Sequence, residues 1–258
     1  AILDASYKRY RLGTYAVAVI VNRANPMRHI STKALAEAFS GEAKTWNRIG
    51  GQESLGRIEL YSTLIAMEAG TVFRQRVMGG IFWGKPFDKE LASFQVKPWR
   101  QQVTEDQVVA KVAKQANAIG FLPWNASISR HMDPQVRLLA ISADKSAEPV
   151  SPTAETIADG SYRATSTVTL YVHPDAPPLA HHFCEFVTGP AGARAARQYG
   201  LWPENELQKI RGGLRVKEMK AGKGPPVIAV GLAGSESLSR ELAEPYVKAK
   251  ALIQVKYQ

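Results

Sequence analysis

Cysteine is almost absent from this chain of 258 residues, which contains a single one, Cys184. One thiol can form neither an internal disulfide nor a multi-thiolate metal site. Long apolar runs are also missing, since no stretch approaches the roughly 18–20 residues that a membrane-spanning helix needs. A hydrophobic share of 45% with 22% charged residues is that of an ordinary globular chain. Membrane-spanning, fibrous and disordered classes are therefore excluded.

The motifs of several enzyme classes are missing as well. The chain has no Walker loop and no Gly-x-Ser-x-Gly elbow, and its His and Asp residues form no convergent hydrolase set. His182 and Glu185 could face together on a helix, but a metal site needs three or four convergent ligands. Cys184 follows Phe183 in an apolar segment, which is typical of a small core residue. The sequence therefore predicts no catalytic residue, no metal and no cofactor.

Positive charge is in excess, with 33 Lys and Arg against 23 Asp and Glu, a formal net charge of +10. Such an excess favours anionic partners, whether nucleic acid, an anionic surface or a small anion. The densest basic stretches are 8–11 and 209–223. The second is rich in Gly and Lys and precedes Pro225 and Pro226, which is typical of an exposed linker. Because the other cations are scattered, we expect no nucleic-acid partner.

Apolar runs of strand type alternate with segments of helical spacing along the whole chain. Strands are expected at 14–22, 57–61, 117–121, 136–141, 165–172, 227–230 and 252–257. Helices are expected at 32–39, 69–78, 190–199 and 236–250, and from residues 104 and 178 onward. This alternation predicts an α/β protein with largely parallel sheets.

Several segments carry a family resemblance. Residues 38–51 read AFSGEAKTWNRIGG, which is similar to the motif IFSGK-x-x-x-W-x-x-IGG of the phosphate-binding protein family of periplasmic solute receptors, which serve ABC importers. Further matches follow in family order, at 117–121, 161–163, 170–172, 186–188, 192 and 199–200. Each match is weak alone, but the ordered set over about Tyr15 to Trp202 is specific.

The resemblance implies a two-lobed type 2 periplasmic-binding-protein fold. In such a receptor the two lobes close around a small anion, and helix N-termini offer it unpaired N–H groups. It implies an extracytoplasmic, non-catalytic protein that binds a small oxyanion such as phosphate and has a membrane transporter as partner. A periplasmic or extracellular location rests on this resemblance alone. The matching ligand-binding positions are Gly70, Thr71, Gly234, Ser235, Glu236 and Ser237.

The order of the segments departs from the family. The family's opening strand, Gly/Ser-rich turn and helix do not precede Tyr15, whereas 227–238 resembles that opening. We therefore expect a domain at 1–210 that lacks its first β-α-β segment, with lobe crossovers near 20–30 and 145–165. A basic linker at 211–226 and a β-α-β unit at 227–258 follow. Three alternatives stay open: a tandem module cut short, a permuted domain whose tail completes the first lobe, and a fragment of a longer chain.

The second departure lies in an oxyanion loop. The family has an Arg shortly before a Ser-Gly-Thr, whereas this chain reads Glu68-Ala69-Gly70-Thr71 and has no Arg between Arg57 and Arg74. A carboxylate about 4 Å from an anion is repelled by roughly 4 kcal/mol per unit charge at an effective dielectric constant near 20. This favours a second hypothesis, a degenerate structural or interaction module of a larger multidomain or tandem-repeat surface or assembly protein.

Overall fold

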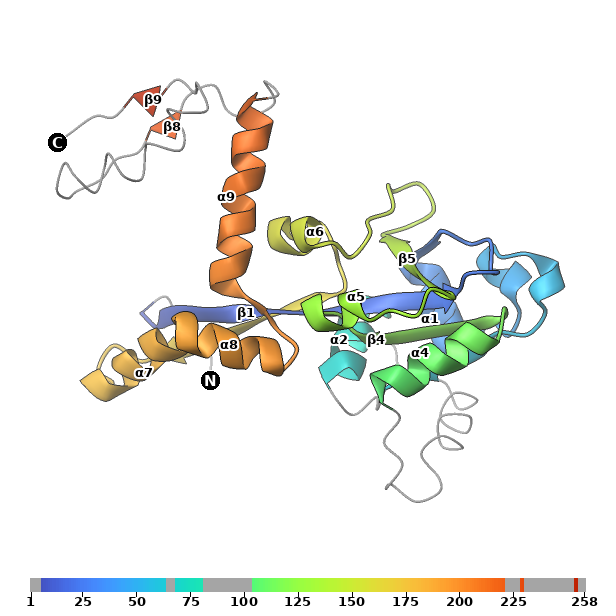
Figure 1. The fold of residues 1–258 in the computed structure, drawn as a ribbon, viewed down its shortest axis with the longest axis horizontal. Coiled ribbons are helices and arrows are strands. Elements are labelled where there is room, and N and C mark those ends of the chain that lie inside the picture. The colour runs from blue at the N-terminus through green and yellow to red at the C-terminus, as the bar shows by residue number, and fades with distance from the viewer. Residues whose placement is uncertain (1–5, 64–67, 81–103, 221–227, 230–252, 255–258) are drawn as a thin grey trace, which may run out of the picture. The chain divides into compact units, whose positions relative to one another are not determined.

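The computed structural model describes residues 6–63, 68–80, 104–220, 228–229 and 253–254 (Figure 1). The chain divides into two compact units, Ala1–Leu207 and Gln208–Gln258. The strands of the first unit are β1 (Lys8–Asn22), β2 (His29–Ser31), β3 (Glu59–Ser62), β4 (Ala118–Pro123), β5 (Val136–Ser142), β6 (Thr165–Val172) and β7 (Trp202–Pro203). Its helices are α1 (Thr32–Phe39), α2 (Glu68–Arg76), α4 (Glu105–Lys114), α5 (Ala126–Arg130), α6 (Ala154–Asp159), α7 (Pro178–Thr188) and α8 (Pro190–Gln198), with the short 3₁₀ turns η1 (Trp46–Ile49) and η2 (Glu53–Leu55).

β1 is the central strand of the first unit. Its apolar run is buried throughout Thr14–Asn22, as the sequence predicted. The first half of β1 pairs with β6 and β7, and the second half pairs with β4 and β5. The partner changes between Ala16, which lies opposite Thr165, and Val17, which lies opposite Pro123. The pairing partners of β1 thus change within the strand, while the lobe crossover expected near 20–30 stays a prediction.

The sheet is mixed, which corrects the expectation of largely parallel sheets. In its larger part, with the order β2-β5-β1-β4-β3, β2 is parallel to β5 and β3 is parallel to β4. β1 runs antiparallel to β4, β5 and β6. A continuous apolar run indicates a strand covered on both faces, but it carries no information about direction. One consequence matters for function, namely that β3 and β4 end at the same edge of the sheet.

Helices cover both faces of this larger part. On one face α4 packs Val108 and Val112 against Ile20 of β1. On the other face Phe39 of α1 and Phe73 of α2 meet the ring of Phe121, and the rings of Phe73 and Phe121 stack with their centroids 4.1 Å apart. The sheet is therefore buried from both sides around β4.

The family-like motif at 38–51 is part of this core. Trp46 is fully buried, and its indole Nε1 donates a hydrogen bond of 2.9 Å to the carbonyl of Asn117. A Cβ atom at Gly51 would lie 2.8 Å from the Trp46 ring, so the motif's second Gly leaves room for that ring. Trp46 therefore packs within its own motif.

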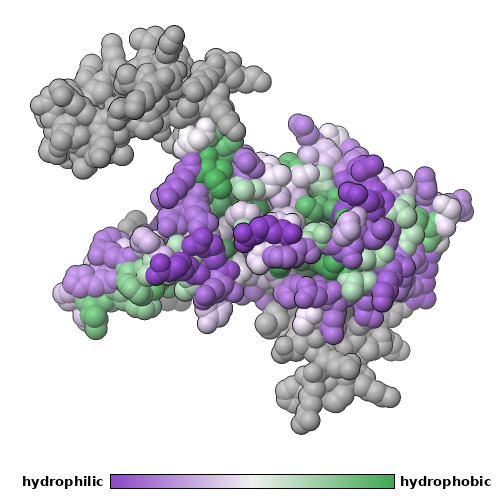
Figure 2. Space-filling view, viewed as in Figure 1, coloured by the Kyte–Doolittle hydropathy of each residue, from purple (hydrophilic) through white to green (hydrophobic). Residues whose placement is uncertain are grey.

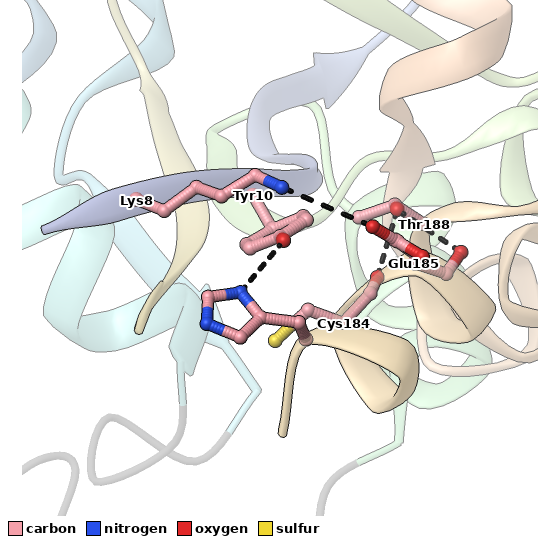
Figure 3. A network of polar contacts seen from close by, with 6 residues as sticks. Lys8, Tyr10, Cys184, Glu185 and Thr188 are labelled. Atoms are coloured by element: carbon pink, nitrogen blue, oxygen red, sulfur yellow. Dashed lines mark hydrogen bonds and ion pairs between the residues drawn. The ribbon is translucent and has the colours of Figure 1, made fainter. Parts of the chain in front are cut away.

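α7 packs one face against the smaller part of the sheet, which consists of the first half of β1 with β6 and β7, and exposes its other face. Cys184 is buried beside Tyr10 and Val172, which confirms its prediction as a core residue. Figure 3 shows the polar links of this inner face to β1: the Tyr10 hydroxyl lies 3.2 Å from His181 Nδ1, and Lys8 pairs with Glu185 at 3.8 Å. On the outer face, large apolar side chains of α7 are exposed, namely Leu179, Phe183 and Phe186. Apolar surface accordingly appears over α7 in Figure 2.

The region after β7 differs from its expectation. α9 (Glu204–Lys220) is continuous, so residues 211–220 of the predicted linker are helical. Around the adjacent Gly212 and Gly213 this segment carries good helix formers, among them Leu, Arg, Lys, Glu and Met, which outweigh the two glycines. In the second unit β8 (Ile228–Ala229) and β9 (Ile253–Gln254) pair in parallel, as a β-α-β unit requires. The unit itself stays a prediction.

No helix among the described residues combines the length and the apolar character that a membrane crossing demands.

Candidate functional site

A cavity of about 570 Å³ opens at the edge where β3 and β4 end. In open α/β sheets, ligands bind outside the carboxyl ends of the strands. The walls come from the ends of β3 and β4, the starts of α2, α4 and α5, the middle of β1 and the end of α8. The lining residues are Tyr15, Thr63, Glu68, Ala69, Thr104, Glu105, Pro123, Asn125, Ser127, Ile128, Arg197, Gln198, Tyr199 and Gly200.

Thr63 lines this cavity and carries a hydroxyl group without a hydrogen-bond partner among the described residues. It directly follows β3 and is only 7% exposed. Its hydroxyl Oγ1 is buried and has no hydrogen-bond partner among the described residues. A buried hydroxyl without a hydrogen-bond partner lowers the stability of the fold. At a cavity wall, a hydrogen bond to a ligand would offset that loss. The sequence reasoning missed Thr63, although its place directly after a strand of an α/β sheet was a usable signal.

The start of α2 reaches the cavity through Glu68 and Ala69. The predicted ligand-binding residues Gly70 and Thr71 lie in the same first turn, just beyond the two lining residues, with Gly70 buried and Thr71 half-buried. N–H groups in a first helical turn have no partner inside the helix and carry a partial positive charge. The role of Gly70 and Thr71 stays a prediction. The other four predicted residues, at 234–237, lie outside the described residues.

Two further helix starts at the cavity are capped by their own side chains. Thr104 Oγ1 accepts a hydrogen bond from the Gln107 amide, and Gln107 Oε1 accepts one from the Thr104 amide. At α5, Asn125 Oδ1 accepts from the amides of Ser127 and Ile128 at 2.9 and 3.1 Å. These capping bonds satisfy backbone amides at the two helix starts and fix this part of the cavity wall.

Three ionic side chains are among the described residues that line the cavity: Glu68, Glu105 and Arg197. Arg197 Nη1 pairs with Glu206 Oε1 at 3.1 Å, so part of its charge is already neutralised. Burial, and then the negative charges of Glu105 and Glu68, raise the pKa of the Tyr15 hydroxyl. Tyr15 therefore stays protonated at neutral pH and can donate a hydrogen bond. Both carboxylates lie close enough to Tyr15 to act on the same hydroxyl.

Gly200 lines the cavity in a backbone conformation that suits glycine. Its φ of +82° lies in the left-handed region that favours glycine. A Cβ atom here would be 3.5 Å from Asn125 Nδ2 and 3.9 Å from the Tyr15 ring, so these two side chains converge beside it. Tyr199, the preceding residue, is 82% exposed and borders the opening.

A second cavity, of about 620 Å³, lies along α1 and η1. Its charged lining includes Lys33 and Glu37, which pair with each other at 3.8 Å. Its hydroxyls Ser31 and Ser142 are already bonded, the first to the Ala34 amide and the second to the Asp144 carbonyl. We therefore take the cavity with Thr63 as the candidate site, because a buried polar group at its wall has no partner among the described residues.

The His181–Glu185 segment does not form a metal site in the described part of the chain. His181 contacts Tyr10 and Glu185 pairs with Lys8, as Figure 3 shows. Among the described residues, no three His, Cys, Asp or Glu side chains gather closely enough to hold a metal ion.

The chain resembles known receptors in sequence and in fold. The family described as a PBP superfamily domain matches residues 4–191. The phosphate-binding protein PstS of Staphylococcus haemolyticus is 28% identical over 170 residues, which are 66% of this chain and 48% of that protein. The chain thus spans about half the length of this curated relative.

Two solved structures have a similar fold. A possible phosphate binding protein from Planctomyces limnophilus superposes with a TM-score of 0.61 at 18% identity, over 81% of this chain and 72% of that one. PstS from Borrelia burgdorferi gives a TM-score of 0.57 at 17% identity, over 79% and 76% of the two chains. With the family match over most of its length, the chain belongs to the periplasmic-binding-protein (PBP) superfamily and has the two-lobed type 2 fold of its members.

Proposed function

We propose that this chain is the solute-binding part of an extracytoplasmic receptor, which holds a small oxyanion such as phosphate in the cavity beside Thr63 without catalysis. The observation that carries the proposal is the buried Thr63 hydroxyl, which lacks a partner among the described residues. It lies at the wall of a cavity that the first turn of α2 also reaches. A hydroxyl donor and helix N–H groups are the donors that bind an oxyanion. The relatives named above as phosphate-binding proteins agree with this chemistry.

The two carboxylates restrict which oxyanion fits. An ionised carboxylate only accepts hydrogen bonds, so Glu68 and Glu105 repel an anion unless it brings a hydrogen of its own. Hydrogenphosphate carries a P–OH group at neutral pH, whereas sulfate carries none. The proposed receptor therefore prefers phosphate over sulfate.

Calorimetric titration of the full chain tests this function. We expect phosphate to bind, sulfate to bind at least about tenfold more weakly, and Thr63→Val to weaken phosphate by about tenfold or more, since a hydrogen bond to a charged ligand contributes about 1.5–3 kcal/mol. Thr167→Val is the matched control, because Thr167 is exposed on β6. An absence of heat with both anions at millimolar concentration would contradict the proposal.

The second candidate is a degenerate module with a structural or interaction role in a larger assembly. Glu68 favours it, because this carboxylate at the start of α2 stands where the resemblance places cationic and hydroxyl groups, and Glu105 at the same cavity favours it too. In that case the fold is kept and the cavity is unused. The same titration separates the two candidates, since a degenerate module binds neither the anions nor the phosphonates described below.

The partner and the location follow from the receptor proposal. A solute receptor of this superfamily delivers its ligand to a membrane transporter and works in the periplasm or outside the cell. We also propose that 227–258 forms a β-α-β unit resembling the start of a PBP-like domain, for which the parallel pair of β8 and β9 is the supporting observation. Limited proteolysis, followed by sequencing of the fragments, tests this boundary: a stable fragment that begins near residue 227 is expected, and cleavage within 228–254 would contradict the proposal.

A further inference from the structure

The charges around the cavity are poorly matched to a simple anion. Glu68 and Glu105 supply two negative charges, and neither forms an ion pair with another described residue. The cation Arg197 shares its charge with Glu206. An acidic residue in a first helical turn also stabilises its own helix, which accounts for either carboxylate alone. Among the described lining residues, two such helix starts set two negative charges against the single, partly paired cation Arg197, so a bare anion adds to the negative charge.

The two carboxylates act on a common region. Both raise the pKa of the Tyr15 hydroxyl, so both lie within electrostatic reach of one atom at the cavity wall. Glu105 is half-buried and Glu68 is exposed, which places the carboxylates at different depths of the site. Tyr15 and the exposed Tyr199 add aromatic rings to the same cavity. Carboxylates together with aromatic rings are the groups that attract an ammonium ion.

The size of the cavity also favours a ligand larger than a simple oxyanion. Sites of about 300–1,000 Å³ hold organic molecules, and this one measures about 570 Å³. A four-oxygen anion is only a few times larger than a water molecule, whose share of liquid volume is about 30 Å³. The cavity therefore has room for a ligand in which a short chain separates two charged ends.

We infer that the ligand of this cavity is a small zwitterion, with an oxyanion at one end and a primary ammonium at the other. The oxyanion end bonds to the Thr63 hydroxyl and to the remaining donors of Arg197, and the ammonium end is held by Glu68 and Glu105. This inference rests on the proposed function, because it keeps the oxyanion and adds the cationic group.

The test compares two ligands that differ only in the amino group. The full chain is titrated calorimetrically with 2-aminoethylphosphonate, with ethylphosphonate and with inorganic phosphate. We expect 2-aminoethylphosphonate to bind about tenfold or more tightly than ethylphosphonate. Glu68→Gln and Glu105→Gln each reduce this ratio to within about threefold, whereas Glu53→Gln, an exposed carboxylate outside the cavity, leaves it unchanged.

The outcomes distinguish this inference from the proposed function. If both phosphonates bind equally, or ethylphosphonate binds more tightly, the zwitterion inference is overturned and the oxyanion receptor stands. If the two ligands differ but neither Glu variant changes the ratio, the assignment of the ammonium to Glu68 and Glu105 is overturned. If none of the three compounds binds, the proposed function fails and the inference fails with it. The ligand comparison needs no variant, so it does not depend on a variant's folding.

Discussion

The Thr63 hydroxyl is buried without a hydrogen-bond partner among the described residues, and a bound ligand would offset the energetic cost. Leaving a buried polar group unsatisfied costs about 1–3 kcal/mol. Valine has nearly the same shape and no hydroxyl, so we expect Thr63→Val to raise the free energy of unfolding of the ligand-free chain by about 1 kcal/mol. Urea denaturation measures this change, and Thr167→Val is expected to stay within about 0.5 kcal/mol. A clear destabilisation by Thr63→Val would show that the hydroxyl has a structural partner instead.

At single positions, the sequence predicts core residues better than the residues of the candidate site. Trp46 and Cys184 could be predicted as core residues, because an aromatic inside a dense motif and a thiol inside an apolar segment have few other uses. Glu68 could be identified by its contrast with a family motif. Thr63 and Glu105 could not be assigned to one site, because their meeting depends on how β3, α2 and α4 are placed in space.

The backbones of α7 and α8 approach each other closely at Gly192. A Cβ atom at Gly192 would lie 1.8 Å from the carbonyl oxygen of Val187, which no side-chain adjustment can relieve. We expect Gly192→Ala to lower the free energy of unfolding by about 2 kcal/mol or more, since one backbone segment must shift. Gly212, in α9, has open space around it, so Gly212→Ala is expected to be neutral or stabilising by up to about 1 kcal/mol. Denaturation curves that show equal changes for both variants would contradict this packing.

The exposed outer face of α7 is expected to contribute little to the stability of the fold. Leu179, Phe183 and Phe186 are 77%, 57% and 62% exposed. Since exposed side chains contribute little to folding, we expect Phe183→Gln with Phe186→Gln to change the free energy of unfolding by less than about 1 kcal/mol. Cys184→Ser, on the buried face, is expected to cost about 1–3 kcal/mol, because it places a hydroxyl among apolar groups. A large loss from the two outer Gln substitutions would mean that this face is covered in solution.

The sequence predicts which helices and strands exist, and in what order, better than it predicts the direction of a strand or the neighbours of a helix. The strand at 14–22 followed from its apolar run, yet its antiparallel pairing with β4, β5 and β6 did not. The direction of a strand depends on how the connecting segments bring the chain back to the sheet. Hydrophobic periodicity carries no information about these connections. Likewise the helix at 178–188 followed from its prolines and spacing, while the exposure of its apolar residues depends on what neighbours the helix finds.

At the scale of the whole molecule, stability depends on a core that contains tyrosines. Tyr162 is fully buried and its hydroxyl donates a hydrogen bond of 2.8 Å to the Val17 carbonyl, on the strand that joins both parts of the sheet. Burial raises the pKa of this hydroxyl, and burial together with Glu105 and Glu68 raises that of Tyr15. In the unfolded chain both groups ionise near their ordinary pKa of 10.0.

The sign of the resulting pH dependence follows from proton binding. Above pH 10 the unfolded chain loses the tyrosine protons and the folded chain keeps them, so the stability present below pH 10 is lost as the pH rises. Each such tyrosine contributes a slope of about −1.4 kcal/mol per pH unit. We expect Tyr162→Phe to lower stability at pH 7, through the lost hydrogen bond, and to make the decline above pH 10 shallower. Tyr199→Phe, at a ring that is 82% exposed, leaves the slope unchanged. Urea denaturation from pH 7 to 11 measures the slopes, and identical slopes in Tyr162→Phe and the parent chain would contradict the burial of a neutral hydroxyl at the centre of the fold.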